Sequence, residues 1–247
     1  CALPISLFLD AERFQAGFGS YDINGHGGVD VADGARVEVL APTLQFKTDL
    51  RNATDRDAAL QAWTAPLYAA DPIDGSVQQR DGAALTLRSE RVTAGGDVRI
   101  GAGADVRVDS GQAIHLLAAG NIDVDGRLTA HGGDILLDDV RAPGVLFNGQ
   151  GSALRYRIGA DAVLDVSGDS YTAVDAGGRL QGVVHDGGSI GIGGTLDWET
   201  ADGITNRPID GFIVIEQGAR LDASGTTAAL DIDGKGRQPV ATDGGSI

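Results

Sequence analysis

One phrase of this chain occurs twice, and its spacing constrains the fold more than any other feature. The stretch DAVLDVSG covers residues 161–168 and GARLDASG covers residues 218–225, so the shared Leu-Asp pairs lie 57 residues apart. The stretch DGGSI, at 186–190 and again at 243–247, repeats with the same spacing. Turn sequences that recur at a fixed interval indicate a repeated structural unit, which is typical of a solenoid.

Further spacings set the expected length of the repeating unit. Gly-Gly-Asp openings begin at Gly95 and Gly132, and related openings at Gly187 and Gly244, which gives intervals of 37, 55 and 57 residues. These intervals are close to two, three and three times a unit of about 19 residues, near the lower end of known solenoid repeats. The two copies of each phrase are therefore expected to lie three coils apart on the same corner.

Short runs of alternating apolar and polar residues fill the intervals between these turns. In VLDVSG, residues 163–168, the alternation predicts that Leu164 and Val166 point inward and that Asp165 faces solvent. Gly168 is expected to turn the chain with a positive φ. Short strands and turns recurring in this way predict an all-β fold, a parallel β-helix with about 19 residues per coil. An antiparallel sandwich also uses short strands, but it predicts no recurrence of turn sequences at fixed multiples.

Two segments interrupt this pattern within what is otherwise a single β-helix over 1–247. The larger excursion spans 41–80, and its stretch DRDAALQAW, residues 55–63, predicts a short helix. The smaller excursion spans 197–211. The larger one has too many apolar residues for a solvated loop, so we expect it to pack on the outer face of the shaft or on a partner. Its candidate interaction surface consists of Leu60, Trp63, Leu67 and Tyr68.

The charge of the chain excludes several classes of partner. The 35 acidic and 19 basic residues give a net charge of −16, which argues against nucleic acid and against anionic membranes. No run of about 18 apolar residues is present, so we expect no membrane span. Cys1 is the sole cysteine, which excludes an internal disulfide. It is either a lipidated N-terminus or the first residue of a fragment of a longer chain, and we favour the fragment.

The sequence offers few candidates for metal binding or catalysis. His131 and His185 each precede glycines, but three coils of separation would place them about 14 Å apart, too far for one metal ion. The stretches GHGGVD at 25–30 and DIDGKG at 231–236 resemble calcium loops, yet each occurs once rather than in tandem. Acidic pairs have no neighbouring His or Lys. We therefore assign no catalytic residue, no metal ligand and no cofactor.

The run GGDVRIGAGADVRVDSGQAIHLLAAGNIDVDGRLTAHGGDILL, residues 95–137, together with ARLDASG and DGGSI, resembles the repeat region of filamentous-haemagglutinin-like exoproteins. The stretch FGSYDINGHGGVDVADGARVEV, residues 18–39, has the same character. These exoproteins are the large partners of two-partner secretion systems. The resemblance implies a right-handed parallel β-helix shaft that an outer-membrane secretion partner exports to the bacterial cell surface or the medium.

The resemblance and the lack of catalytic motifs predict a non-catalytic shaft of an adhesin or filamentous protein, serving adhesion, cell–cell cohesion or biofilm formation. Its expected partners are flanking coils of the same longer chain and a host or bacterial surface receptor or exopolysaccharide. A first alternative is a β-helix that binds or cleaves polysaccharide, although Trp63 and Trp198 lie far apart in the sequence. A second is the stalk of a contact-dependent toxin-delivery exoprotein, which a toxin domain beyond Ile247 would distinguish.

Overall fold

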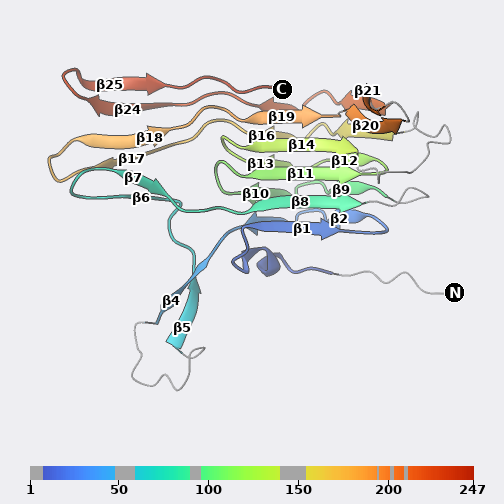
Figure 1. Cartoon of the computed structure of the whole chain (residues 1–247), viewed down its shortest axis with the longest axis horizontal. Helices are drawn as coiled ribbons and strands as arrows, with labels where there is room; N and C mark the ends of the chain where they lie inside the picture. Colours follow the sequence, from blue (N-terminus) through green and yellow to red (C-terminus); the bar gives the residue numbers. More distant parts are fainter. Residues whose placement is uncertain are drawn as a thin grey trace.

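Three parallel five-stranded sheets, here called sheets A, B and C, form the core of the molecule. The computed structural model describes residues 8–47, 59–89, 96–139, 154–193, 195–200, 203–208 and 211–247. The chain visits sheets A, B and C in this order five times, and one such passage is called a circuit (Figure 1).

Sheet A contains β1 (Ser20–Asn24), β8 (Ala84–Ser89), β11 (Ala113–Ala118), β14 (Asp134–Asp139) and β19 (Ser189–Ile192). Sheet B contains β2 (Val29–Val31), β9 (Val98–Ile100), β12 (Ile122–Val124), β15 (Leu154–Ile158) and β22 (Gly211–Ile215). Sheet C contains β3 (Arg36–Val39), β10 (Asp105–Val108), β13 (Arg127–Thr129), β16 (Val163–Asp165) and β23 (Arg220–Asp222).

This topology confirms the predicted all-β fold with parallel strand pairing. Strands that follow one another in a sheet belong to successive circuits, an arrangement consistent with a β-helix-like fold. The sheets are not closed. The antiparallel sandwich is wrong for this core, because the strand pairs within the three sheets are parallel.

The register between circuits corrects the expected repeat length. Leu164 and Leu221 are direct partners in the neighbouring strands β16 and β23, so the two phrases lie one circuit apart and not three. The shortest circuit takes 21 residues, from Ala113 to Asp134, rather than about 19. The interval of 57 residues is therefore one circuit lengthened by two hairpins, which the sequence pattern mistook for further coils.

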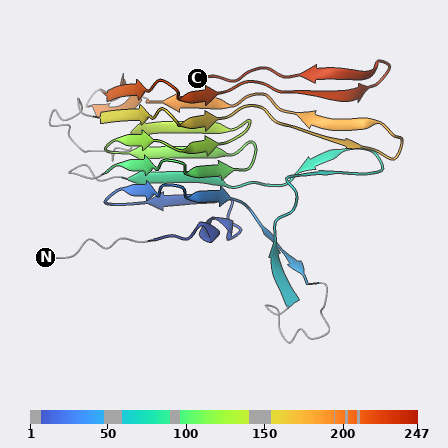
Figure 2. The same cartoon turned by 180° about the vertical axis from the view of Figure 1, so that it is seen from behind.

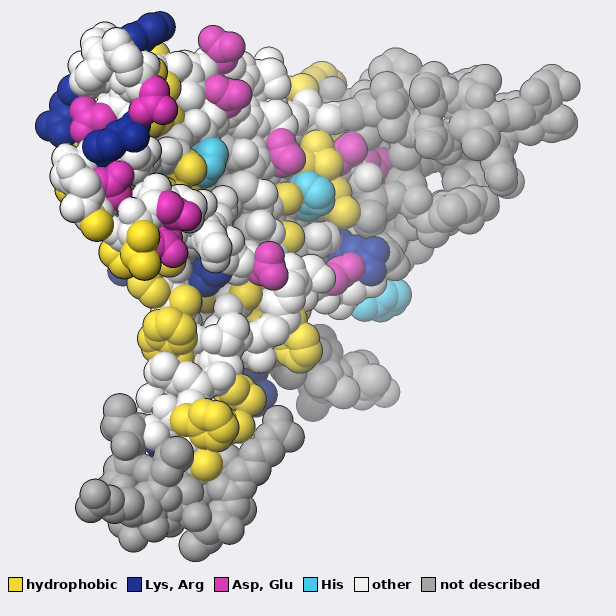
Figure 3. All heavy atoms as spheres, turned by 60° about the vertical axis from the view of Figure 1, so that its left-hand side comes forward, with side chains coloured by type: hydrophobic (Ala, Val, Ile, Leu, Met, Phe, Trp, Pro, Cys, Tyr) yellow, Lys and Arg dark blue, Asp and Glu magenta, His cyan; other side chains and the backbone are white. Residues whose placement is uncertain are grey.

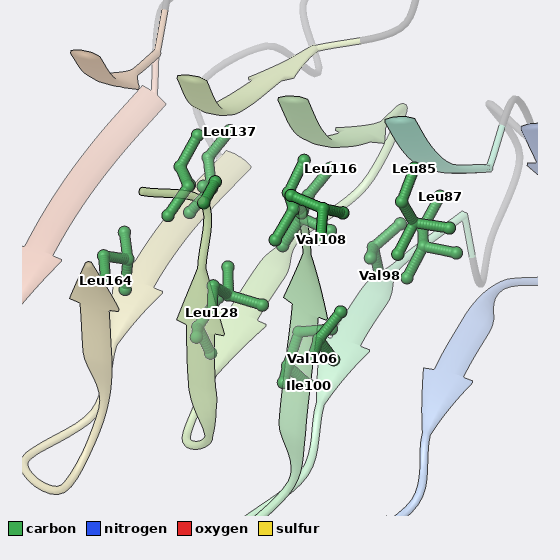
Figure 4. Packing of buried hydrophobic residues seen from close by; sticks show 14 of the residues in the cluster. Leu85, Leu87, Val98, Ile100, Val106, Val108, Leu116, Leu128, Leu137 and Leu164 are labelled. Carbon is green, nitrogen blue, oxygen red and sulfur yellow. The ribbon is translucent and has the colours of Figure 1, made fainter. Parts of the chain in front are cut away.

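The core lies between the three sheets and is built from aliphatic side chains in stacked columns (Figure 4). In β11 the even positions Ile114, Leu116 and Ala118 are fully buried, while the residues between them are partly exposed. Small residues such as Ala130 fill the corners. Burying one Leu or Ile in this way stabilises the fold by about 1.5–3 kcal/mol, so the columns supply the main force that holds successive circuits together.

The repeated phrase forms a hydrogen-bonded turn at the ends of the sheet C strands β16 and β23. The Asp165 carboxylate accepts hydrogen bonds from the Ser167 backbone N–H at 3.1 Å and hydroxyl at 2.7 Å. Asp222 and Ser224 repeat both contacts, at 3.0 and 2.7 Å. These bonds from Ser224, helped by Arg220, lower the pKa of Asp222 to about 2. Asp165 is partly exposed between the buried Leu164 and Val166, in agreement with the predicted alternation, and its carboxylate also folds back onto the turn.

Glycine recurs at these corners because the backbones of neighbouring circuits approach closely. A Cβ atom on Gly168 would lie 2.2 Å from the His185 carbonyl oxygen, and the predicted positive φ is absent. Gly133, Gly188 and Gly245 form a column in which a Cβ on Gly188 would lie 1.8 Å from the Gly133 oxygen. One on Gly245 would lie 1.7 Å from the Gly188 oxygen. The DGGSI phrase thus marks a corner that has no room for a side chain.

Five antiparallel hairpins extend from the circuits in the described ranges. Three of them, β6–β7, β17–β18 and β24–β25, lie stacked on one side of the sheets, and β4–β5 projects away from the stack (Figures 1 and 2). The smaller predicted excursion, 197–211, covers all of β20–β21 except the first two residues of β20, whereas the sequence did not predict β17–β18 or β24–β25. The strands are β4 (Thr43–Phe46), β5 (Leu60–Trp63), β6 (Tyr68–Ala70), β7 (Val77–Gln79), β17 (Ser170–Val174), β18 (Leu180–Val184), β20 (Thr195–Thr200), β21 (Gly203–Pro208), β24 (Thr227–Ile232) and β25 (Gly236–Ala241).

The structure corrects one predicted helix and shows one short helix near the N-terminus. The helix predicted over 55–63 is wrong for its last four residues, because Leu60–Trp63 form strand β5, and residues 55–58 lie outside the described residues. A 3₁₀ helix, η1 (Ala11–Gln15), packs against β3 at the N-terminal end of the stack. Its Phe14 is buried beside the ring of Tyr21, and so it covers the first circuit.

The three kinds of corner differ in how much chain they carry. Connections from sheet B to sheet C take only two to four residues, as in 125–126 and 101–104. Connections from sheet C to sheet A take four residues at 109–112 and 44 residues at 40–83. The stacked hairpins all arise at this second corner, so it positions the candidate functional surfaces.

Candidate functional site

The projecting hairpin, β4 and β5, carries an apolar face. Antiparallel partners share a face, so the pairs Leu44–Ala62 and Phe46–Leu60 lie on one side of the hairpin. The side of Leu44 and Phe46 is poorly covered: these two residues are 60% and 70% exposed. Apolar side chains are visible on this projection in Figure 3. A two-stranded hairpin is marginally stable alone, so an exposed apolar face here is a candidate contact surface.

The structure divides the predicted interaction surface between two places. Leu60 and Trp63 belong to the projecting hairpin, where Trp63 is 43% exposed on the face opposite Leu60. Tyr68 is only 9% exposed and belongs to the junction between the stacked hairpins and the sheets. Leu67 precedes it, and its carbonyl accepts the Arg80 backbone N–H at 2.9 Å. The sequence did not predict Leu44 and Phe46, although their alternation with Thr43 and Gln45 is a strand signal.

The junction cluster centres on the carboxylate of Asp169, at the start of the β17–β18 hairpin. The Ser110 hydroxyl donates to Asp169 Oδ2 at 2.7 Å, and the Tyr68 hydroxyl donates to the same oxygen at 3.0 Å. His185 Nδ1 lies 2.7 Å from Asp169 Oδ1 and 3.1 Å from the Tyr68 oxygen. We define the junction cluster as Tyr68, Ser110, Asp169, Tyr171 and His185.

Burial and hydrogen bonding act on the cluster in opposite directions. Burial alone would raise the pKa of Asp169, but the hydrogen bonds from Ser110, His185 and Tyr68 outweigh it and lower this pKa below its ordinary value. Burial, followed by the hydrogen bond to the Asp169 carboxylate, raises the pKa of Tyr68. The Tyr68 ring also stacks on Tyr171, with centroids 5.3 Å apart. The cluster therefore favours a charged Asp169 and a neutral Tyr68.

Arg80 lies at the other end of the segment 67–80, which contains Tyr68, and attaches that end to the sheets. Its guanidinium forms two parallel hydrogen bonds with the Asp109 carboxylate, at 2.7 and 2.8 Å, and both side chains are largely buried. It also donates to the carbonyls of Ala65 and Asp81 at 2.8 and 2.9 Å. Gln79 adds a hydrogen bond to the Ser110 carbonyl at 2.8 Å. A bidentate arginine of this kind fixes orientation as well as contributing energy.

The arrangement of the cluster does not match nucleophilic catalysis. In a Ser-His-Asp triad the histidine lies between the serine and the aspartate. Here Ser110 donates to Asp169 directly, and the distances place Asp169 between Ser110 and His185. The hydrogen bonds of the cluster join separate segments of the chain, so they attach the hairpins to the sheets.

The positions of His131 and His185 differ from those expected from the sequence. His131 and His185 lie on adjacent corners, since a Cβ on Gly132 would lie 3.7 Å from the His185 Cβ, so the predicted separation of about 14 Å is wrong. Each histidine has its own partner: His131 Nδ1 lies 3.2 Å from the Ser167 carbonyl, and His185 pairs with Asp169. Within the described ranges no three His, Cys, Asp or Glu side chains form a group that could hold a metal ion.

The carboxylates of the two calcium-like loops pair with arginines. Asp30 lies 2.9 Å from the Arg99 guanidinium, and Asp231 lies 3.2 Å from that of Arg237. Asp233 pairs with Arg179 at 2.5 Å. Apart from Asp231, these side chains are substantially exposed, so solvent screens their attraction and each pair stabilises the fold only weakly. The Asp30–Arg99 pair joins neighbouring circuits, the Asp233–Arg179 pair joins neighbouring hairpins, and the Asp231–Arg237 pair lies within the β24–β25 hairpin.

Acid is expected to weaken the junction cluster. Because the folded-state pKa of Asp169 is lowered, its stabilising effect is complete above the ordinary carboxyl pKa and is lost as the pH falls through the lowered value. We expect Asp169→Asn to lower the free energy of unfolding by about 2 kcal/mol at pH 7, because hydrogen bonds to the charged carboxylate are removed. Urea titrations at pH 7 and pH 3 measure this difference. It should shrink in acid, and a difference that is equal at both pH values would contradict the assignment.

Comparisons with other proteins complete this description. None of the helices in the described ranges has the length and apolar character needed to cross a membrane. Searches of the chain against family models, curated proteins and solved structures find no match. The geometry of the projecting hairpin and of the junction cluster is therefore what bears on function.

Proposed function

We propose that this chain is a non-catalytic structural shaft of a secreted or surface-exposed bacterial adhesin, folded as a right-handed parallel β-helix. The observation that carries the proposal is a stack of three parallel sheets from which hairpins project at one corner. Such a stack extends by adding circuits, and it presents its hairpins at fixed positions. A protein of this kind works by spacing and presenting contact surfaces rather than by chemistry.

Two further features support a role in extension and contact. Strand β22 exposes four consecutive apolar residues, and its Ile213 is 53% exposed although its register partner Tyr156 is 2% exposed. An apolar edge strand favours pairing with further strands, which suits flanking circuits of a longer chain. The projecting hairpin supplies the candidate contact with a surface receptor or exopolysaccharide. Export through an outer-membrane secretion partner, and roles in cohesion or biofilm, belong to the same proposal.

A binding assay with matched variants tests the contact surface. We expect Leu44→Ser/Phe46→Ser to reduce adhesion of the purified protein to bacterial cells and to immobilised exopolysaccharide at least about tenfold, because central apolar residues dominate binding energy. Val174→Ser is the matched control, since Val174 is similarly exposed at 62% but lies on β17. Circular dichroism should show unchanged β structure in both variants.

Two results would contradict the proposal. Equal adhesion of the wild type and the Leu44/Phe46 variant would remove the projecting hairpin as the contact surface. Release of reducing ends from a polysaccharide by the purified chain would overturn the non-catalytic role and favour the polysaccharide-active alternative.

A further inference from the structure

The segment Leu67–Arg80, here called the strap, connects circuits that are not neighbours. It contains β6 and β7 and belongs to the connection between circuits 1 and 2. Its Arg80 and Gln79 hold the corner between circuits 2 and 3, through Asp109 and the Ser110 carbonyl. Its Tyr68 holds Asp169 and His185, which belong to the connection between circuits 4 and 5. The strap therefore passes the corner between circuits 3 and 4 and contacts the next one.

Further contacts attach the strap to the β17–β18 hairpin. The Ala176 backbone N–H donates to the Pro72 carbonyl at 2.7 Å, so the tips of the two hairpins are joined. At the base of the hairpins, the Tyr68 ring stacks on Tyr171. Ser110 and Asp169, from corners two circuits apart, are themselves hydrogen-bonded at 2.7 Å beneath Tyr68. The strap is thus held at both ends and at its tip. Its hairpin β6–β7 lies beside β17–β18 (Figure 1).

In an ordinary stack each unit contacts only its neighbours, so the ends open one unit at a time. Here the β17–β18 hairpin cannot leave the stack without also breaking the contacts of the strap. We propose that the strap is a staple that ties the β17–β18 hairpin to the corner between circuits 2 and 3, and so makes circuits 2 to 5 open as one unit. This inference rests on the fold and not on the adhesive role.

Hydrogen exchange of the full chain, followed by mass spectrometry, tests the staple. In the wild type we expect β8, β11, β14 and β19 to share one degree of protection, because they open together. Tyr68→Ala should accelerate exchange in β17, β18 and β19 about tenfold or more while leaving β8 unchanged. Tyr68→Phe keeps the ring stacked and removes only the hydroxyl, so it should give a smaller change of about fivefold in the same strands.

A core substitution provides the matched control. Leu128→Ala removes a fully buried side chain of circuit 3, and it should accelerate exchange in all four strands by one common factor because the stack still opens as a unit. The staple is overturned if Tyr68→Ala accelerates exchange only within β6 and β7. It is equally overturned if Tyr68→Ala and Leu128→Ala give the same uniform pattern.

Discussion

Replacing Gly188 with alanine is expected to destabilise the protein by about 3 kcal/mol or more, because the new Cβ has no space. This Cβ would lie 1.8 Å from the Gly133 carbonyl oxygen, which is backbone and cannot rotate away. The same oxygen accepts the Ser189 N–H at 3.0 Å, and the Gly188 N–H donates to the Val166 carbonyl at 2.7 Å. Relief of the overlap therefore requires circuits 4 and 5 to separate, with loss of these hydrogen bonds.

The measurement is the midpoint and slope of urea unfolding, with Gly27→Ala as the control. A Cβ on Gly27 would meet no atom within 4 Å, so this substitution should change the free energy of unfolding by less than about 0.5 kcal/mol. Similar effects of the two substitutions would show that the glycine column is not closely packed. The close approach of the circuits would then need revision.

Replacing Arg80 with alanine is expected to cost about 3–5 kcal/mol, since it leaves a buried carboxylate without its partner. Asp109 is 8% exposed, and the two hydrogen bonds from Arg80 are its charged contact. The carbonyls of Ala65 and Asp81 would lose their donor as well. Chemical denaturation of the variant at neutral pH measures this loss.

A double substitution separates the effect of the unpaired buried charge from the effect of lost side-chain volume. Arg80→Met/Asp109→Leu removes both charges and keeps similar volume, so most of the stability lost in Arg80→Ala should return. Arg36→Ala is the control, because the Arg36–Glu38 pair has the same closest distance of 2.7 Å but its arginine is 67% exposed. If the double variant is as unstable as Arg80→Ala, the hydrogen bonds to the carbonyls, and not the buried charge, dominate at this site.

The repeated phrases predict the local structure well because the residues that form each turn all lie within the phrase. Leu164 points inward, Asp165 accepts the hydrogen bonds of the turn, and Gly168 allows the next backbone to approach. The length of the circuit could not be predicted in the same way. Strand β17 of the β17–β18 hairpin alternates in burial just as circuit strands do, so periodicity does not distinguish an antiparallel hairpin strand from a parallel one.

The junction cluster could not be predicted because its contacts are far apart in the sequence. Tyr68 and Asp169 are separated by 101 residues, and Ser110 and Asp169 by 59. No spacing rule connects a tyrosine in an irregular segment with an aspartate that follows a turn glycine. The sequence holds only an indirect signal for this contact. Tyr68 and Arg80 can both be buried against a polar partner, although their segment otherwise resembles a loop.

The unequal corners of the stack have a consequence for protein engineering. Since the connection from sheet C to sheet A ranges from four to 44 residues while the strands on both sides keep their pairing, this corner tolerates foreign sequence. The tight four-residue connections at 109–112 and 130–133 differ in access, because the strap covers the first. The second contains Gly133, which has no room for a side chain, so the better graft position for a peptide epitope is the turn of the β24–β25 hairpin, where a Cβ on Gly234 would meet no atom within 4 Å.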